Sequence, residues 1–282
     1  MSENAKERDF WSGPSGRSWI THEARQDALL ASVADLVIAE ARIATGERVV
    51  DIGCGTGAVS ELAAEAVGPE GHVLALDISE PLLLRATERL AALPQVATHL
   101  GDAASVDWSD PRFDVAVSRF GVMFFADPVR AFANIAKGLV PGGRVVFAAW
   151  APAVENPLWH LAAVAATERL GKLPPVPPNA PGPMGLSSLD HAHSVLEQSG
   201  FDAFAVTPTA VTLSYPHAAE DLADLMVSVG AATRIINAFK ASEAEIADIR
   251  DGILGRLMPY VSGDGGVDLP ALINLITARV PE

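Results

Sequence analysis

The residues with the clearest chemical use are three glycines at alternate positions, Gly53, Gly55 and Gly57. They follow an apolar run over residues 48–52 and precede a run over 58–67 with helical apolar spacing. Glycine reaches positive φ and has no Cβ, so the backbone of such a turn can approach a ligand closely, and the helix that follows offers free N–H groups. The segment is predicted to be a strand, a turn and a helix built against a nucleotide-like ligand.

Two carboxylates follow the next two predicted strands. Asp77 lies 20 residues after Gly57, where a carboxylate can accept hydrogen bonds from the ribose hydroxyls of an adenosine. The alternative is that Asp77 only caps a helix beginning near Pro81. Asp102 follows the third predicted strand, where a carboxylate can accept from the exocyclic amine of an adenine.

The glycine loop by itself fits two classes of cofactor. Gly53, Gly55 and Ala58 also satisfy the looser fingerprint of dinucleotide-binding folds, so an NAD-dependent oxidoreductase is the second hypothesis. Asp102, and a sheet that ends in a hairpin rather than in a second nucleotide-binding half, favour a cofactor with one nucleoside. A non-catalytic ligand-binding protein on the same fold is the third hypothesis.

Taken together, these motifs resemble those of the class I S-adenosylmethionine-dependent methyltransferases. The resemblance is closest to the ubiquinone/menaquinone-biosynthesis-like small-molecule methyltransferases, which carry a type 11 methyltransferase domain, and it covers about residues 10–215. It rests on four motifs and the turn before the fifth strand: DIGCGTG at 51–57, LDIS at 76–79, GDA at 101–103, FDVAVS at 113–118 and LVPGG at 139–143.

The resemblance implies S-adenosylmethionine as the cofactor and assigns residues to its parts. The methionine portion and the ribose would lie against the backbone of Gly53, Gly55 and Gly57, with Asp51 facing the amino group. The nucleoside would contact the next two strand ends: Asp77 at the ribose hydroxyls, Ile78 on the adenine face, and Asp102 with the Ala103 amide at the adenine edge. The methyl-bearing end would lie beside the end of the fourth strand: Ser118 and Arg119.

Aromatic residues mark the expected acceptor side of the site. Phe10, Trp11 and Trp19 lie in an otherwise polar N-terminal arm, and an electron-rich ring stabilises a sulfonium or an aromatic substrate. Trp19 is therefore predicted to contact the cofactor, the alternative being that these rings only anchor the arm. The apolar run over 120–125 favours a small lipophilic or aromatic acceptor, although core packing explains that run equally well.

Methyl transfer from a sulfonium is an in-line displacement that depends mainly on alignment and on the exclusion of water. It needs neither a covalent nucleophile nor a metal, and no metal site is predicted. A hydroxyl acceptor would benefit from a general base, for which each of the candidate histidines is individually weak: His22, His160, His191 and His193. No catalytic residue is assigned.

Strands alternate with helices between residues 47 and 150, which is typical of an α/β fold with a parallel sheet. The strands are predicted at 48–52, 72–77, 97–100, 113–118 and 144–150, and two further β-prone runs, 201–207 and 210–215, predict a hairpin. The resemblance implies a Rossmann-like seven-stranded sheet, mostly parallel with an antiparallel last strand, and helices on both faces.

Five segments are predicted along the chain. They are an N-terminal arm and helix that acts as a lid (1–45), the S-adenosylmethionine-binding core (46–150), a helical and proline-rich insertion that covers the substrate (151–195), the end of the sheet core (196–216) and a C-terminal helical appendage (217–282). Within the appendage, helices are predicted at 217–230, 243–257 and 269–279.

The composition restricts the partners. With 35 acidic and 20 basic residues the formal charge is −15, which repels nucleic-acid phosphates and anionic membrane surfaces. The single cysteine, Cys54, rules out an intrachain disulfide, and no apolar run is long enough to span a bilayer, so a cytoplasmic protein is expected. The expected partner is a small-molecule methyl acceptor, and a homodimer is left open.

Overall fold

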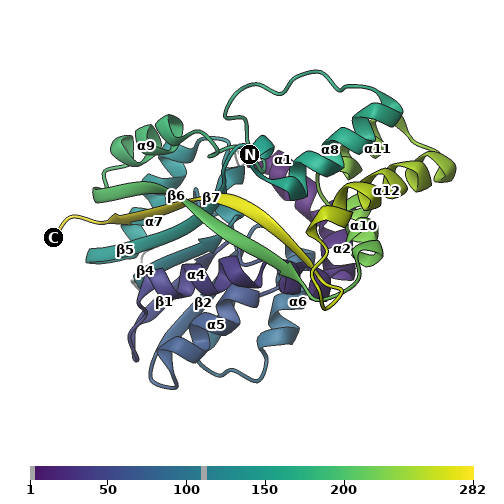
Figure 1. The fold of residues 1–282 in the computed structure, drawn as a ribbon. Coiled ribbons are helices and arrows are strands. Elements are labelled where there is room, and N and C mark those ends of the chain that lie inside the picture. Colours follow the sequence, from purple (N-terminus) through teal and green to yellow (C-terminus); the bar gives the residue numbers. More distant parts are fainter. Residues whose placement is uncertain (1–3, 109–112) are drawn as a thin grey trace.

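The computed structural model describes residues 4–108 and 113–282, so the first three residues of the predicted arm lie outside the described residues. Seven strands of the described chain form one sheet, in the order β3-β2-β1-β4-β5-β7-β6, with helices on both faces (Figure 1). The strands are β1 Arg48–Ile52, β2 His72–Asp77, β3 Val96–Leu100, β4 Phe113–Arg119, β5 Leu139–Trp150, β6 Asp202–Tyr215 and β7 Val267–Arg279. The predicted fold class is confirmed.

The helices of the first half are α1 Ala5–Ser12, α2 Pro14–Thr21, α3 Glu23–Leu29, α4 Ala31–Ala41, α5 Ala58–Val67, α6 Glu80–Leu90, η1 Gly121–Phe124 and α7 Pro128–Gly138. Those of the second half are η2 Ala153–Glu155, α8 Pro157–Leu170, α9 Leu189–Gln198, α10 Ala219–Ser228, α11 Ala231–Phe239, α12 Glu243–Leu257 and η3 Met258–Tyr260. Side-chain oxygens of Ser79, Asp127, Ser188 and Ser242 cap four of them and define where these helices begin.

The strands β1 to β5 are parallel and pair in the order that alternating strands and helices predict. Most side chains of β1, β2 and β4 are buried, as expected where helices cover both faces of a parallel sheet. Their carboxyl ends meet at one edge, where the glycine loop follows β1. This edge positions the candidate site.

The predicted hairpin at 201–207 and 210–215 is wrong, because both runs belong to one strand, β6. Pro208 lies in the middle of this strand and pairs with Asn274 of β7. Proline cannot donate to a sheet ladder, but β6 is the last strand of the sheet order and has one free edge, where a missing N–H is tolerated.

The helix predicted at 269–279 is also wrong, because these residues form β7. Leu269, Ile273 and Ile276 have helical spacing, but they belong to an apolar run that only Asn274 interrupts. A strand with neighbours on both sides has the same pattern. As the fold class predicts, this last strand is antiparallel to its neighbours β5 and β6. The sheet core therefore does not end at residue 216, and α10 to α12 are an insertion between β6 and β7 rather than a C-terminal appendage.

The inserted helices form a cover at one end of the sheet, where α11 and α12 pack against α8 and α10 packs against α12 (Figure 1). The proline-rich run over 173–183 has neither helix nor strand, as predicted, and the Gly182 N–H donates to the Met123 carbonyl at 3.1 Å. No single helix in the described chain is long and apolar enough to cross a membrane; only α10 and α11 taken together, bent by 52°, reach that length and composition.

Candidate functional site

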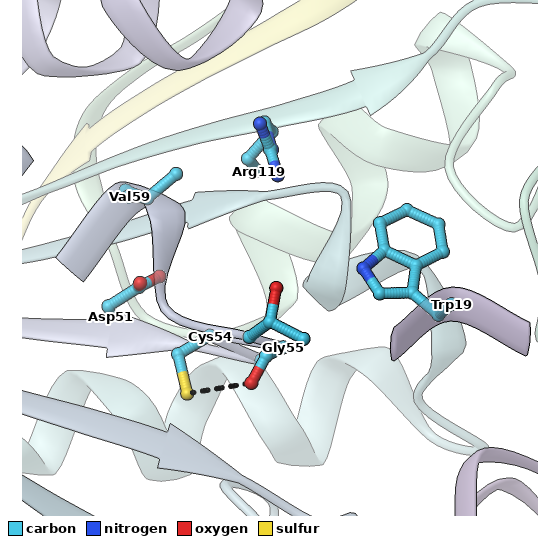
Figure 2. A pocket seen from close by; sticks show the side chains of 8 residues that line it. Trp19, Asp51, Cys54, Gly55, Val59 and Arg119 are labelled. Carbon is cyan, nitrogen blue, oxygen red and sulfur yellow. Dashed lines mark hydrogen bonds between the residues drawn. The ribbon is translucent and has the colours of Figure 1, made fainter. Parts of the chain in front are cut away.

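A small cavity of about 40 Å³ lies at the carboxyl ends of β1 and β4, beside the glycine loop (Figure 2). Four parts of the chain line it: the arm, the end of β1, the glycine loop with the start of α5, and the end of β4. The lining residues are Trp19, Asp51, Gly53, Cys54, Gly55, Thr56, Val59 and Arg119. The structure thus brings together the predicted site residues Trp19, Asp51, Gly53 and Gly55.

The glycine loop depends on backbone conformations that other residues rarely adopt. Gly53, Gly55 and Gly57 have φ values of +68°, +57° and +91°. A Cβ on Gly53 would lie 2.9 Å from the Cα of Gly121, whereas one on Gly55 would meet nothing within 4 Å. Gly53 is therefore needed for the close approach of two backbone segments, and Gly55 leaves its face of the loop free for a ligand.

Asp51 is a buried carboxyl at the end of β1, only 1% exposed. Its Oδ2 accepts a hydrogen bond of 2.7 Å from the Ser60 hydroxyl on α5. Burial raises the pKa of Asp51 to about 7, although the Ser60 hydrogen bond and the Arg119 charge oppose that rise. An incoming cation would return this carboxyl to its ionised form.

Arg119, the last residue of β4, is the cation of the cavity. Its side chain is 9% exposed, and burial lowers the pKa of its guanidinium. In the described part of the chain, its Nη1 donates to the Leu30 carbonyl at 3.4 Å and its Nη2 lies 3.5 Å from Asp27 Oδ1. Both distances are long for charge-assisted hydrogen bonds, so the guanidinium keeps donor capacity for an anion in the cavity.

Ion pairs hold the arm against the core and orient Arg119. Asp27 on α3 accepts from Arg89 on α6 at 2.5 Å, and Arg89 also contacts Glu61 on α5 at 2.7 Å. The same Asp27 carboxylate faces Arg119. Helix α3 is thereby joined to α5, α6 and the end of β4, and the guanidinium of Arg119 is held at the wall of the cavity.

Asp77 supports the glycine loop. The carboxyl is 6% exposed, Oδ2 accepts from the Gly55 N–H at 2.8 Å, and Oδ1 accepts from the Ser79 N–H at 2.8 Å. Burial raises its pKa to about 6. The side chain that caps α6 is that of Ser79, which accepts from the Leu82 N–H, so the capping role considered for Asp77 belongs to Ser79. Each Asp77 oxygen keeps a lone pair that a ribose hydroxyl could use.

The predicted adenine residues lie further along the same edge and do not line the cavity. Asp102 follows β3, and its Oδ1 accepts from the Ala104 N–H at 2.9 Å and from the Asn4 side chain at 2.9 Å. Ala103 is buried, and Ile78 is half-buried in the turn after β2. Contact of these residues with a nucleoside stays a prediction, as does that of Gly57.

Ser118 connects strands rather than facing the cavity. It is fully buried, its hydroxyl donates to the Ile52 carbonyl at 2.7 Å, and it accepts from the Gly121 N–H at 3.1 Å. These bonds join the end of β4 to the end of β1 and to the turn beyond it. The neighbouring Arg119 lines the cavity instead, and contact between Ser118 and a cofactor remains a prediction.

Aromatic rings of the arm gather at the cavity. Trp11 packs edge-on against Trp19 and against Phe124 of η1, with ring centroids 5.9 Å and 5.3 Å apart. The Trp11 carbonyl accepts from the Ser79 hydroxyl at 2.9 Å. The rings therefore anchor the arm, and one of them, Trp19, also forms a wall of the cavity (Figure 2).

The candidate histidines do not line the cavity. His22 connects α2 to α3 and faces an open surface groove with Arg25, and His160 is exposed. His191 is half-buried on α9, and the His193 ring packs on Phe204 at 4.8 Å. The geometry favours none of them as a general base.

Sequence reasoning missed several site residues. Thr56 and Val59 line the cavity without any polar pattern that marks them. Asn4 contacts Asp102 across 98 positions of sequence, a pairing that only the folded arm creates.

Comparison with known proteins identifies a methyltransferase domain in the chain. Residues 49–143 match a family model described as a methyltransferase domain. An arsenite methyltransferase of Halobacterium salinarum is 28% identical over 226 residues, which cover 76% of this chain and 54% of that protein. A demethylmenaquinone methyltransferase of Symbiobacterium thermophilum is 32% identical over 112 residues, 39% of this chain and 45% of that protein.

The structure of the YcgJ protein from Bacillus subtilis is similar in fold, with a TM-score of 0.57 and 18% identity over 88% of this chain and 98% of that one. This chain spans about half the length of the two sequence relatives. The matched domain covers β1 to the start of β5, including the glycine loop and the strand ends that carry Asp51, Asp77, Asp102 and Arg119. These comparisons support a class I S-adenosylmethionine-dependent methyltransferase, with residues 49–143 as its methyltransferase domain.

Proposed function

We propose that the protein transfers the methyl group of S-adenosylmethionine to a small lipophilic or aromatic molecule. The observation that carries this proposal is the pairing of Asp51 and Arg119 at one cavity beside the glycine loop. A buried carboxyl and a buried guanidinium that line one cavity match the ammonium and the carboxylate of an amino acid. The methionine end of the cofactor carries both of these charges.

The order of the strands supports a cofactor that extends along the sheet edge. From the cavity at β1 and β4, the next strand is β2, which ends at Asp77, and the one after is β3, which is followed by Asp102. A cofactor laid along this edge would place its methionine in the cavity and its ribose hydroxyls at Asp77. Its adenine amine would then lie at Asp102. A dinucleotide offers no ammonium for Asp51.

The cofactor supplies an activated methyl group on a sulfonium. The chain's residues have to hold the reactants in line and keep water away. Such positioning alone gives large effective molarities, so no acid–base residue is required. Arg119 and Asp51 would fix the amino-acid end, and the walls formed by Trp19 and Val59 would exclude water beside it.

The aromatic cluster of Trp11, Trp19 and Phe124 supports an apolar acceptor. Phe120 and Met123, from the apolar run after β4, are buried, so packing accounts for that part of the run. One relative is named for arsenite and another for demethylmenaquinone. The rings beside this cavity favour a flat, apolar acceptor of the second kind, since aromatic faces stack on one another and cover apolar surface.

Calorimetry with S-adenosylmethionine, S-adenosylhomocysteine and NAD tests the cofactor. Binding of the first two without NAD is expected, and the reverse pattern would support the oxidoreductase hypothesis. S-adenosylhomocysteine release should then be measured with quinols, phenols and arsenite as acceptors. Turnover only with arsenite would contradict an apolar acceptor, and binding without turnover on any acceptor would favour a ligand-binding protein.

The substitution Asp77→Ala tests the nucleoside end. If the carboxylate accepts from the ribose hydroxyls, S-adenosylhomocysteine binding weakens by about 1.5 to 3 kcal/mol. The same change leaves the N–H groups of Gly55 and Ser79 without their acceptor, so the free energy of unfolding should also fall by about 1 to 3 kcal/mol. Titration calorimetry and urea unfolding measure the two effects. A loss of stability with unchanged affinity would restrict Asp77 to supporting the loop.

A further inference from the structure

Asn4 precedes α1 at the position where an asparagine side chain normally caps a helix. It makes no capping hydrogen bond and is only 3% exposed. Its Nδ2 instead donates to Asp102 Oδ1 at 2.9 Å, and its Oδ1 accepts from the Ala126 N–H at 2.7 Å. The local capping hydrogen bond is given up for a contact 98 residues away.

The groups that Asn4 presents are those of an adenine edge. A carboxamide offers one N–H donor beside one carbonyl acceptor. Adenine offers its exocyclic amine as a donor beside a ring nitrogen as an acceptor. Asp102 is the residue that the proposed function assigns to the adenine amine, and in this structure Asn4 donates to that carboxylate.

The arm also limits the space at the site. The cavity beside the glycine loop measures about 40 Å³, whereas pockets for molecules of cofactor size measure about 300 to 1,000 Å³. The contacts that hold the first two helices of the arm over this edge include Asn4 on Asp102, the Trp11 carbonyl on the Ser79 hydroxyl, and Trp19 at the cavity wall. A cofactor that reached from Asp51 to Asp102 would have to move this part of the arm.

We propose that Asn4 is an internal competitor for the adenine position, so that a cofactor binds by displacing the arm from Asp102. The inference rests on the proposed function, because it takes Asp102 as the adenine ligand. The measured affinity is then the intrinsic affinity reduced by the fraction of molecules whose arm is released. Weakening the Asn4 contact raises that fraction and tightens binding.

Titration calorimetry of the full-length chain with S-adenosylhomocysteine and with 5′-methylthioadenosine tests this competition. Asn4→Ala removes both hydrogen bonds, and Asn4→Asp sets a second carboxylate against Asp102. Both variants should bind both ligands about fivefold or more tightly than the wild type, because a hydrogen bond to a carboxylate no longer opposes binding. Asn237→Ala, the same change at an exposed position of α11, should leave both dissociation constants unchanged.

Each other outcome is informative. Unchanged or weaker binding by the Asn4 variants would overturn the competition, and weaker binding would make Asn4 part of the ligand's own site. A gain for S-adenosylhomocysteine without a gain for 5′-methylthioadenosine would also overturn it, because both ligands carry the adenine. If neither the wild type nor the variants bind S-adenosylhomocysteine, the proposed function itself fails. A single cooperative unfolding transition in each variant confirms that it is folded.

Discussion

The parallel half of the sheet and its antiparallel end are held together in different ways. Strands β1 to β4 have five to seven residues, and their carboxyl ends are connected by hydrogen bonds through Ser118 and Asp77. Strands β6 and β7 have 14 and 13 residues and are held mainly by a long antiparallel ladder. Short strands leave their ends free to form a site, whereas the long pair closes the sheet and carries the inserted helices.

The two regions therefore differ in what a substitution should disturb. In the parallel half, three glycines with positive φ lie in one loop and the buried charged groups lie at the strand ends around it, so single changes should affect both stability and ligand binding. At the antiparallel end, the turns and ion pairs are exposed, and single changes should have small effects on either.

The largest difference is expected for glycine substitutions. Gly53→Ala combines a positive φ with a Cβ 2.9 Å from Gly121, and should lower the free energy of unfolding by about 3 kcal/mol or more. Gly265→Ala, in the turn before β7, also has a positive φ but meets nothing within 4 Å, and should cost about 1 kcal/mol. Urea unfolding measures both. Equal losses of unfolding free energy would show that the close approach of the Gly121 backbone to Gly53 adds nothing to the cost of the positive φ.

The next largest effect concerns the buried cation. Arg119→Met should weaken S-adenosylhomocysteine about 10- to 100-fold, because a charge-assisted contact to the carboxylate is lost. Binding of 5′-methylthioadenosine, which lacks the amino-acid end, should change little. Arg256→Met removes an exposed ion pair between α12 and Glu168 of α8, neither of which lines the cavity, and should alter neither affinity. An equal loss for both ligands would place Arg119 in a general structural role.

A smaller effect is expected from pH. Because the pKa of Asp51 is raised from 3.8 to about 7, the folded chain keeps a proton that the unfolded chain has lost. The contribution of this group to stability is therefore fully present below pH 4 and is lost as pH rises through about 7. An ammonium beside Asp51 favours the ionised form, so affinity for S-adenosylhomocysteine should rise about fivefold between pH 6 and 7 and level off above about pH 8.

Titration calorimetry in two buffers of different ionisation enthalpy measures this proton release. Asp51→Asn should remove most of the pH dependence. If the dependence survives in that variant, Asp77, whose pKa is raised to about 6, becomes the group responsible.

The parallel half was predictable because its signals are local. Glycines at alternate positions and carboxylates after apolar runs each depend on a few neighbouring residues. Trp19, Asp51, Gly53 and Gly55 do line the cavity. Their roles toward a cofactor stay predictions. The same reasoning could not place Val59 or Asn4, because their positions depend on the packing of α5 and of the arm.

The antiparallel end was misread because its signals depend on tertiary context. Pro208 marks a turn in most sequences, but here it lies on a free sheet edge. Pro270 lies where β7 pairs with β6 alone, since the pairing of β7 with β5 covers residues 273–279. The sequence of one strand does not reveal which strands lie beside it in the sheet, and so does not show whether one of its edges is open.

The central claim is that one cavity holds the amino-acid end of the cofactor between Asp51 and Arg119. A crystal structure of the full-length chain with S-adenosylhomocysteine tests it most directly. The account predicts the ligand's ammonium at Asp51, its carboxylate at Arg119 and its adenine at Asp102. A ligand whose carboxylate lies away from Arg119, or whose adenine lies at the cavity beside Trp19, would contradict it.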